Sequence, residues 1–582
     1  MTESTSSYDK SPFIAVPGDV PVRKGWEAVC EHLREWLRAR RRTVLVVDTY
    51  PGVHDAEVLG ELRSRLRPGL TICTLDLRKP EPELLKLIGG NLTDDRIFGV
   101  MSGYELEEFL NEERLEGARR SVAAFREGLV LIYGVGAERV DTGDLLVYAD
   151  MARWEIQLRQ RRGAGNWGAG NGAEDFFRKY KRGYFVEWRA ADRHKFGLFE
   201  RVDFFLDTHQ PGQPKLVEGK AVRTGLEQAV TRPFRVVPFF DPAPWGGHWM
   251  QKVCALNGQA PNYGWCFDCV PEENSLLLGF GPELIELPSL NLVYYASVPL
   301  LGEKVHARFG PEFPIRFDFL DTIGGGNLSF QVHPLTEFIR EHFGMSYTQD
   351  ESYYLLDAGP DASVYLGLRE GIDQRAMVRD LEAAQVAGGS FDVEHYANRW
   401  PAKKHDHFLI PAGTVHCSGA NSMVLEISAT PYIFTFKMWD WGRLGLDGKP
   451  RPVHLNHGIP NIQWDRTTGW VKRELINGIQ PLGRGKDWRE ERTGLHSSEF
   501  IETRRHWFRG RTPHDTQGGL NVLNLVEGQE AVVESPEGRF EPFVVHYAET
   551  FIVPAAVGPY SIRPHGPAEG RECATIKASV RT

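Results

Sequence analysis

The chain has 582 residues, a formal net charge of −10 and a pI of about 6.1, and 41% of its residues are hydrophobic. At roughly 100–200 residues per domain, this length predicts about three to five domains. The acidic charge argues against nonspecific nucleic-acid binding, which depends on basic patches. No stretch approaches the roughly 18 apolar residues of a membrane helix, so we expect no membrane association.

The cysteines and the N-terminus predict the cellular compartment. The seven cysteines are scattered, and the one close pair, Cys266 and Cys269, has no second pair at zinc-ribbon spacing. We therefore interpret WCFDC as a strand with small side chains. Scattered thiols are typical of a reducing compartment. The opening MTESTSSYDKSPF lacks the apolar core of a signal peptide, and we predict a cytoplasmic protein.

The first part of the chain is expected to be an α/β domain at 23–225, after a flexible leader at 1–22. Residues 26–40 predict an amphipathic helix. Short apolar runs at 44–47, 70–77, 129–133 and 145–148 are typical of buried strands in a mainly parallel sheet. The glycine-rich segment 163–175 is either a lid or a plain surface loop.

From about Val236 onward, short strands and frequent turns predict a β-rich fold. Helical periods return only at 335–343 and 373–385, as insertions between strands. FLIPAGTVH and FIVPAAVGP form a weak internal repeat that suggests two related β-barrels. We therefore expect one domain at 235–490, with the helical insertion, and a second at 495–582.

Four polar side chains of this β region form a candidate metal site. In the strand LSFQVHP, alternation places Ser329, Gln331 and His333 on the face opposite the apolar residues. Glu351 opens the next strand, and His416 follows a Pro-Ala-Gly turn. Two imidazoles, a carboxylate and an amide oxygen suit zinc and leave room for water or substrate. Taken singly, each residue has a plainer explanation as a hydrogen-bonded core residue.

Together with their context, these motifs resemble a known family. SFQVHP, DESYYLLDAGPDASVYLGL, FLIPAGTVHCSGANSMVLEISAT and FTFKMWDWGRLGLDGKPRPVHL follow one another as in class I (cupin-type) mannose-6-phosphate isomerases. PWGGHWM and FPIRFDFLDT also resemble that family. The resemblance covers about residues 235–570. It implies a double-cupin (β-barrel or jelly-roll) module, one zinc ion per chain, and a small-molecule sugar phosphate as partner.

The resemblance also implies roles for individual residues. The zinc ligands would be Gln331, His333, Glu351 and His416. Glu426 would be the base that moves a proton between C1 and C2 through a cis-enediol, with Glu351 as a nearby alternative. Lys437 and Arg443 would stabilise enediolate charge and bind phosphate, with Ser329 beside the phosphate or the metal. Surface salt bridging is the plainer interpretation of both cations.

Several positions depart from the family pattern. Gln349 and Asp318 stand where the family usually has lysine, Cys266 lies in an altered Trp-Cys-Phe element, and Lys437 replaces an arginine. The metal ligands are thus complete while the substrate-binding residues are altered. Three hypotheses remain: a sugar-phosphate isomerase, a sugar-binding or regulatory protein with an intact zinc site, and another cupin activity such as an oxygenase. The alternating pair His405 and His407 is a weaker metal candidate.

The N-terminal region has the strand–loop–helix outline of a phosphate-binding loop in VLVVDTYPGVHDAEVL. It resembles a remote uridine-kinase-like P-loop fold. The loop DTYPGVHD lacks the lysine and the Ser/Thr that bind phosphate and magnesium, and Asp55 would repel phosphate. We therefore predict a degenerate, non-catalytic kinase-like domain. The cluster Arg178, Lys179, Lys181 and Arg182 remains a candidate anion or nucleotide site.

Overall fold

The computed structural model describes residues 6–37, 41–386, 389–430, 432, 434–494 and 496–582. The chain divides into two compact units. One comprises residues 13–228 and 275–295, here called the α/β unit. The other comprises residues 1–12, 229–274 and 296–582, here called the β unit. Within the described ranges, no helix has the length and apolar character needed to cross a membrane.

The α/β unit is built on a seven-stranded sheet in the order β2-β8-β7-β6-β3-β5-β4. Strands β3 to β7 are parallel, and β8 is antiparallel to β7. The apolar run of β3 is buried on both faces, as expected for a central strand of a parallel sheet. The predicted mainly parallel α/β layer is therefore confirmed. A small separate sheet pairs β1, β11 and β12.

The elements of the α/β unit follow the predicted apolar runs. Its strands are β1 (Phe13–Ala15), β2 (Arg23–Lys24), β3 (Arg42–Thr49), β4 (Leu70–Cys73), β5 (Gly128–Gly134), β6 (Leu145–Asp150), β7 (Phe204–Asp207), β8 (Lys215–Glu218), β11 (Ser275–Phe280) and β12 (Glu283–Pro288). Its helices are α1 (Gly25–Leu37), α2 (Asp55–Leu66), α3 (Glu81–Leu92), α4 (Glu112–Ala124), α5 (Arg153–Arg161), α6 (Phe176–Arg182), α7 (Trp188–Leu198), α8 (Gly219–Ala229) and α10 (Leu290–Tyr295). Residues 38–40 of the predicted helix at 26–40 lie outside the described residues.

The carboxyl ends of the parallel strands carry buried charges that pair with one another. Asp48 of β3 accepts hydrogen bonds from the amides of Gly136 and Glu138, and its carboxylate lies 2.9 Å from His194 Nε2. Asp150, at the end of β6, pairs with Lys195 at 3.1 Å. Ligands of open α/β sheets bind at this edge. Here the chain's own side chains fill that position.

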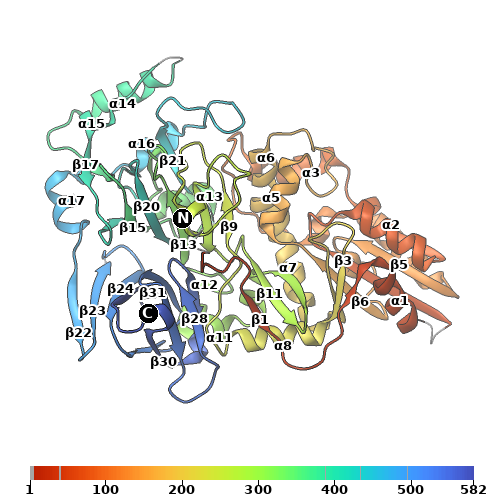
Figure 1. The fold of residues 1–582 in the computed structure, drawn as a ribbon. Helices are drawn as coiled ribbons and strands as arrows, with labels where there is room; N and C mark the ends of the chain where they lie inside the picture. Colours follow the sequence, from red (N-terminus) through yellow and green to blue (C-terminus); the bar gives the residue numbers. More distant parts are fainter. Residues whose placement is uncertain (1–5, 38–40, 387–388, 431, 433, 495) are drawn as a thin grey trace. The chain divides into compact units, whose positions relative to one another are not determined.

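The β unit contains two pairs of antiparallel sheets. The first pair has strand orders β18-β15-β20-β13-β10-β9 and β17-β16-β19-β14-β21. The second pair has orders β22-β23-β24-β31-β26-β29 and β25-β30-β27-β28, seen in blue in Figure 1. Residues from both sheets of the second pair, among them Phe508, Leu523 and Ile562, form one buried core. The predicted β-rich fold is confirmed, and the chain as a whole combines α/β and β architecture.

The first sheet pair consists of β9 (Phe239–Asp241), β10 (Trp265–Cys269), β13 (Arg316–Asp321), β14 (Phe330–Val332), β15 (Glu351–Ala358), β16 (Ser363–Leu368), β17 (Ala397–Pro401), β18 (His407–Ile410), β19 (His416–Ser418), β20 (Ser422–Ser428) and β21 (Phe436–Trp439). The second consists of β22 (Gln480–Arg484), β23 (Trp488–Gly494), β24 (Ile501–Phe508), β25 (Thr512–Asp515), β26 (Asn521–Glu527), β27 (Glu530–Glu534), β28 (Phe543–His546), β29 (Thr550–Val553), β30 (Pro559–Pro564) and β31 (Cys573–Val580).

Helices of the β unit are short. They are α9 (Trp249–Val253), α11 (Ser297–Leu301), α12 (Glu303–Phe309), α13 (Thr336–Phe343), α14 (Gln374–Ala384), α15 (Val393–Tyr396), α16 (Leu455–Asn461) and α17 (Thr468–Glu474). The two predicted insertions correspond to α13 and α14. Helix α14 begins where the Asp373 carboxylate accepts the amides of Arg375 and Ala376, a side-chain cap of the usual kind. Cys266 and Cys269 lie in strand β10, as the strand interpretation predicted.

The glycine-rich segment 163–175 is tied down by a buried lysine. The Lys179 ammonium donates hydrogen bonds to the carbonyls of Gln160, Ala164 and Gly172 at 2.6, 3.0 and 2.9 Å. Lys179 is only 2% exposed. The surface-loop interpretation is thus favoured over a lid. Lys179 is also committed to backbone carbonyls, which removes it from the candidate anion site.

We expect Lys179→Met to destabilise the protein, because three backbone carbonyls lose the buried ammonium that donates to them, while the side chain keeps its length. The free energy of unfolding should fall by about 2–4 kcal/mol. Urea denaturation followed by tryptophan fluorescence measures this change. The exposed Lys220→Met is the matched control and should change stability by less than about 0.5 kcal/mol. Equal stability of the two variants would show that the hydrogen bonds from Lys179 do not stabilise segment 163–175.

Candidate metal centre

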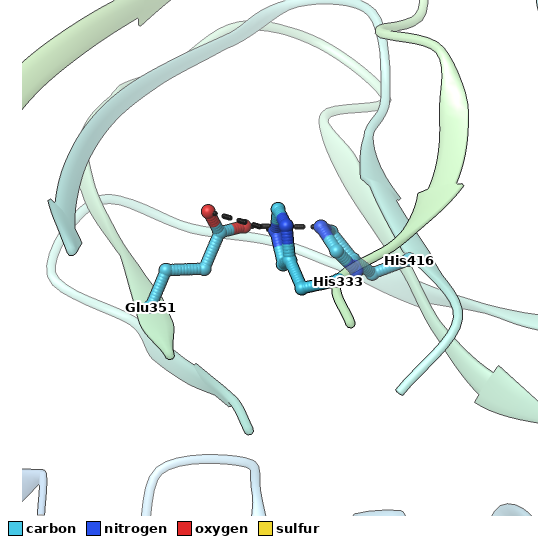
Figure 2. Close-up of side chains that lie close together, drawn as sticks. All are labelled: His333, Glu351 and His416. Carbon is cyan, nitrogen blue, oxygen red and sulfur yellow. Dashed lines mark ion pairs between the residues drawn. The ribbon is translucent and has the colours of Figure 1, made fainter. Parts of the chain in front are cut away.

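Three side chains converge inside the first sheet pair of the β unit (Figure 2). His333 Nε2 lies 3.1 Å from one oxygen of Glu351, and His416 Nε2 lies 3.0 Å from the other. All three residues are at most 2% exposed. Among the described residues, they form the one group of three or more His, Cys, Asp or Glu ligand atoms within 4.8 Å of one another.

Each ligand comes from a different strand or strand end. His333 directly follows β14, Glu351 opens β15, and His416 opens β19. Gln331 of β14 is paired in register with His416, and its amide nitrogen is placed 3.2 Å from His416 Nε2. Rotation of this amide about its last side-chain bond would turn its oxygen, a metal-binding atom, toward the same point. The structure therefore brings together all four residues that the sequence singled out.

Both imidazoles are oriented by the backbone. His333 Nδ1 lies 2.8 Å from the carbonyl of Phe434, and His416 Nδ1 lies 2.9 Å from the carbonyl of Thr414. A donated Nδ1–H fixes the tautomer and leaves Nε2 with a lone pair that faces Glu351. Metal-binding histidines are usually held in this way.

The donor set fits a small divalent cation. His333 Nε2 and Glu351 Oε1 are buried and, within the described part of the chain, have no hydrogen-bond partner. Ligands bound at about 2.0–2.2 Å to one tetrahedral ion lie about 3.3–3.6 Å apart, and the separations here, 3.0 and 3.1 Å, are slightly shorter. Burial raises the pKa of Glu351, but the two imidazoles hold it well below its usual range. The carboxylate is thus in the ionised form that binds metal.

Gln349, one of the departures from the family pattern, supports this site directly. Its amide nitrogen donates to Glu351 Oε2 at 3.0 Å, and its amide oxygen accepts the Phe434 amide at 3.0 Å. Gln349 thus connects Glu351 to the same backbone segment that orients His333. Sequence reasoning noted the substitution but did not predict this contact.

Glu426 lies beside the cluster on the neighbouring strand. In β20 it is paired in register with Tyr353 on one side and Asp318 on the other. Burial, followed by the charges of Glu351 and Asp318, raises the pKa of Glu426 well above its ordinary value. Burial also raises the pKa of Asp318 to about 7, although Arg316 acts in the opposite direction. Two adjacent carboxyl groups with raised pKa values can hold and exchange a proton.

The predicted cations lie on the opposite sheet and its following loop. Lys437 of β21 is paired in register with Gln331. Arg443 donates to the carbonyl of Asn327 at 2.6 Å and pairs with Asp440, which also pairs with Arg451. Sequence reasoning missed Asp440 and Arg451. Ser329, the remaining predicted substrate residue, is buried directly before β14.

The weaker metal candidate behaves differently. His405 accepts or donates at Nδ1 with Tyr354 and lies 3.2 Å from Glu527, while His407 is fully buried at the start of β18. Burial lowers the pKa of His407 to about 3 and that of His405 to about 4. Neither belongs to the three-ligand group described above.

Comparisons with known proteins give two different results along the chain. Residues 25–231 match a family described as a domain of unknown function (DUF8485). The chain is 29% identical over 271 residues to the mannose-6-phosphate isomerase of Streptococcus mutans, covering 45% of this chain and 77% of that relative. It is 29% identical over 154 residues to mannose-6-phosphate isomerase ManA of Bacillus subtilis, covering 26% of this chain and 45% of that relative.

The solved mannose 6-phosphate isomerase from Bacillus subtilis overlays with a TM-score of 0.49 at 17% identity, covering 60% of this chain and 99% of that chain. The matched segment spans less than half the length of ManA and about three quarters of the length of the Streptococcus mutans relative. The sequence relatives confirm the expected kinship of this chain with isomerase enzymes.

Proposed function

We propose that this chain is a zinc-dependent aldose–ketose isomerase of a sugar phosphate, interconverting mannose 6-phosphate and fructose 6-phosphate. The observation that carries the proposal is the buried Glu351 carboxylate between the imidazoles of His333 and His416, with the carboxyl group of Glu426 on the adjacent strand. The names of the sequence relatives support the same reaction and substrate.

Zinc would be held by Gln331, His333, Glu351 and His416, one ion per chain. When bound, it would supply Lewis-acid polarisation of the sugar's oxygens. Glu426 is the proposed base: it takes the proton from C2 of the opened aldose and returns it to C1. Its raised pKa suits this exchange, because a carboxyl group of ordinary pKa would be a weaker base at neutral pH.

Lys437 and Arg443 are the proposed anchors for the anionic part of the substrate, with Ser329 nearby. The Arg443–Asp440 pair would keep the guanidinium in a fixed position at the edge of the site. The same pair favours the second candidate function, a sugar-binding regulatory protein without turnover. Arg443 N–H groups that bond to Asp440 are not available to the substrate. In both cases we expect the zinc site to be intact.

We also propose a domain assignment. The two sheet pairs support a double-cupin module, with domains at 235–490 and 495–582. Residues 23–225 of the α/β unit are proposed to form a degenerate P-loop kinase-like domain, since strand β3 lies in the centre of the parallel strands and leads through DTYPGVHD into helix α2. Arg182, another member of the candidate anion site, is buried and paired with Glu187 and Glu81.

We expect His416→Ala to abolish zinc binding, because it removes one of two imidazoles from a buried site. Elemental analysis of purified protein should give one zinc per wild-type chain and almost none for the variant. His405→Ala, which removes a half-buried histidine of the β unit outside this group, should keep one zinc. Because histidine ligands must be neutral, zinc occupancy should also fall as the pH is lowered and the imidazoles become protonated. Equal zinc in both variants would place the metal elsewhere.

Turnover should depend on Glu426. A coupled assay of mannose 6-phosphate isomerisation should show kcat reduced by about 10²- to 10⁴-fold in Glu426→Gln, with zinc content unchanged. Exposed Glu341→Gln is the matched control and should keep full activity. Full activity in Glu426→Gln would refute the assignment of the base. Zinc and sugar-phosphate binding without turnover in the wild-type protein would favour the regulatory function.

The α/β unit is expected not to bind ATP–magnesium tightly, since its loop lacks a lysine and Asp48 already occupies the amides of Gly136 and Glu138. Isothermal titration of the full chain with ATP–magnesium should give no measurable heat at micromolar protein. Submillimolar affinity accompanied by hydrolysis would show a working P-loop.

A further inference from the structure

One wall beside the metal centre is lined by carboxyl groups. Alternation along β15 places Glu351 and Tyr353 on the same face of the six-stranded sheet. Tyr353 is paired with Glu426, and Glu426 is paired with Asp318 on β13. Asp318 therefore lies two strands from Glu351 on the face that carries the metal ligand.

Asp318 has an oxygen that no group of the described chain satisfies. The residue is 7% exposed, and its Oδ1 is buried without a hydrogen-bond partner among the described residues. Its Oδ2 lies 3.9 Å from a nitrogen of Arg316, too far for a hydrogen bond. A buried carboxylate oxygen without a donor is costly, so a structural role alone does not account for it.

Arg316 cannot neutralise this wall. It is 2% exposed, donates to the carbonyl of Thr430 at 2.6 Å, and lies within the electrostatic influence of Asp318, Glu426 and Glu272. One guanidinium thus faces several carboxyl groups. A phosphate dianion placed here would be repelled in a poorly screened interior. The wall instead suits a neutral group that donates hydrogen bonds.

We propose that Asp318 binds the hydroxyl-bearing carbon chain of the substrate, with Oδ1 accepting a hydrogen bond from a sugar hydroxyl, and that this wall excludes the phosphate. The inference rests on the proposed isomerase site and adds the orientation of its ligand. The phosphate then lies toward the opposite sheet, where Lys437 and Arg443 are found. Asp318 is thus a specificity-determining residue that the metal ligands alone do not reveal.

The test is equilibrium binding to the zinc-loaded full chain by isothermal titration. The probes are mannose 6-phosphate and its deoxy analogues, each lacking one hydroxyl. In the wild type, loss of one particular hydroxyl should weaken binding roughly 10- to 100-fold, as for a hydrogen bond to a charged group. In Asp318→Leu, binding of mannose 6-phosphate should be weakened by a similar factor, and the same deoxy analogue should bind no more weakly than mannose 6-phosphate.

Asp318→Asn keeps the side-chain shape and serves if the leucine variant does not fold. In this variant, removal of the same hydroxyl should weaken binding by a smaller factor than in the wild type, with zinc content unchanged. Its melting temperature should be no lower than that of the wild type, because charge repulsion with Glu426 is relieved. Asp321→Asn is the control on the same strand. Asp321 accepts the amides of Met250 and Ile323, so its variant should lose stability without altering the response to any hydroxyl.

The outcomes separate this inference from the proposed reaction. If removing a hydroxyl weakens binding by the same factor in the wild type and in the Asp318 variants, the proposed role of Asp318 is wrong. It is also wrong if the wild type binds no hexose or hexose phosphate. A lowered melting temperature of Asp318→Asn with unaltered binding would show that Asp318 is structural. Binding that couples to Asp318 without turnover would overturn only the isomerase assignment.

Discussion

The site in the β unit depends on one buried carboxylate, that of Glu351, placed between two imidazoles. Burying an ionised carboxyl group is costly unless partners compensate it. Here His333 directly follows β14 and His416 opens β19 in one sheet, whereas Glu351 opens β15 in the other. The carboxylate therefore joins the two sheets. Backbone carbonyls lie against Nδ1 of both imidazoles and so direct each Nε2 toward the carboxylate, where the three groups could share a cation.

That central charge shapes its surroundings. The wall that continues from Glu351 carries Glu426 and Asp318, and burial next to a fixed negative charge disfavours ionisation of both. A divalent cation between the ligands would reduce this repulsion. Neighbouring buried carboxyl groups repel one another, so they stay close together only where the surrounding structure fixes their positions. Strand register does so here, because β15, β20 and β13 are neighbours in one antiparallel sheet.

Periodicity and motif order predicted much of this from the sequence. Alternation in LSFQVHP placed Gln331 and His333 on one face, and the spacing of Glu351 and His416 followed a family pattern. Strand β3 and helix α14 were predicted from apolar period and turn signals. The sequence did not predict that Gln349 would bind Glu351, or that Asp440 would engage Arg443 and Arg451. Those contacts depend on loop paths and on strands distant in sequence, which a local pattern does not encode.

Three buried acids of the α/β unit and the acidic wall beside the metal ligands differ in how their charge is compensated. Three buried acids of the α/β unit each have a base within hydrogen-bonding distance: Asp48 with His194, Asp150 with Lys195, and Asp192 with Arg153. Such matched pairs fix a fold but leave little for a ligand to gain. At the wall in the β unit, Asp318 and Glu426 both lie near a single arginine, Arg316, which is 3.9 Å from Asp318. Positive charge is therefore insufficient to compensate both carboxyl groups. The cost of burying carboxyl groups without donors is offset when a ligand supplies those donors. This is the physical reason to place the substrate at that wall.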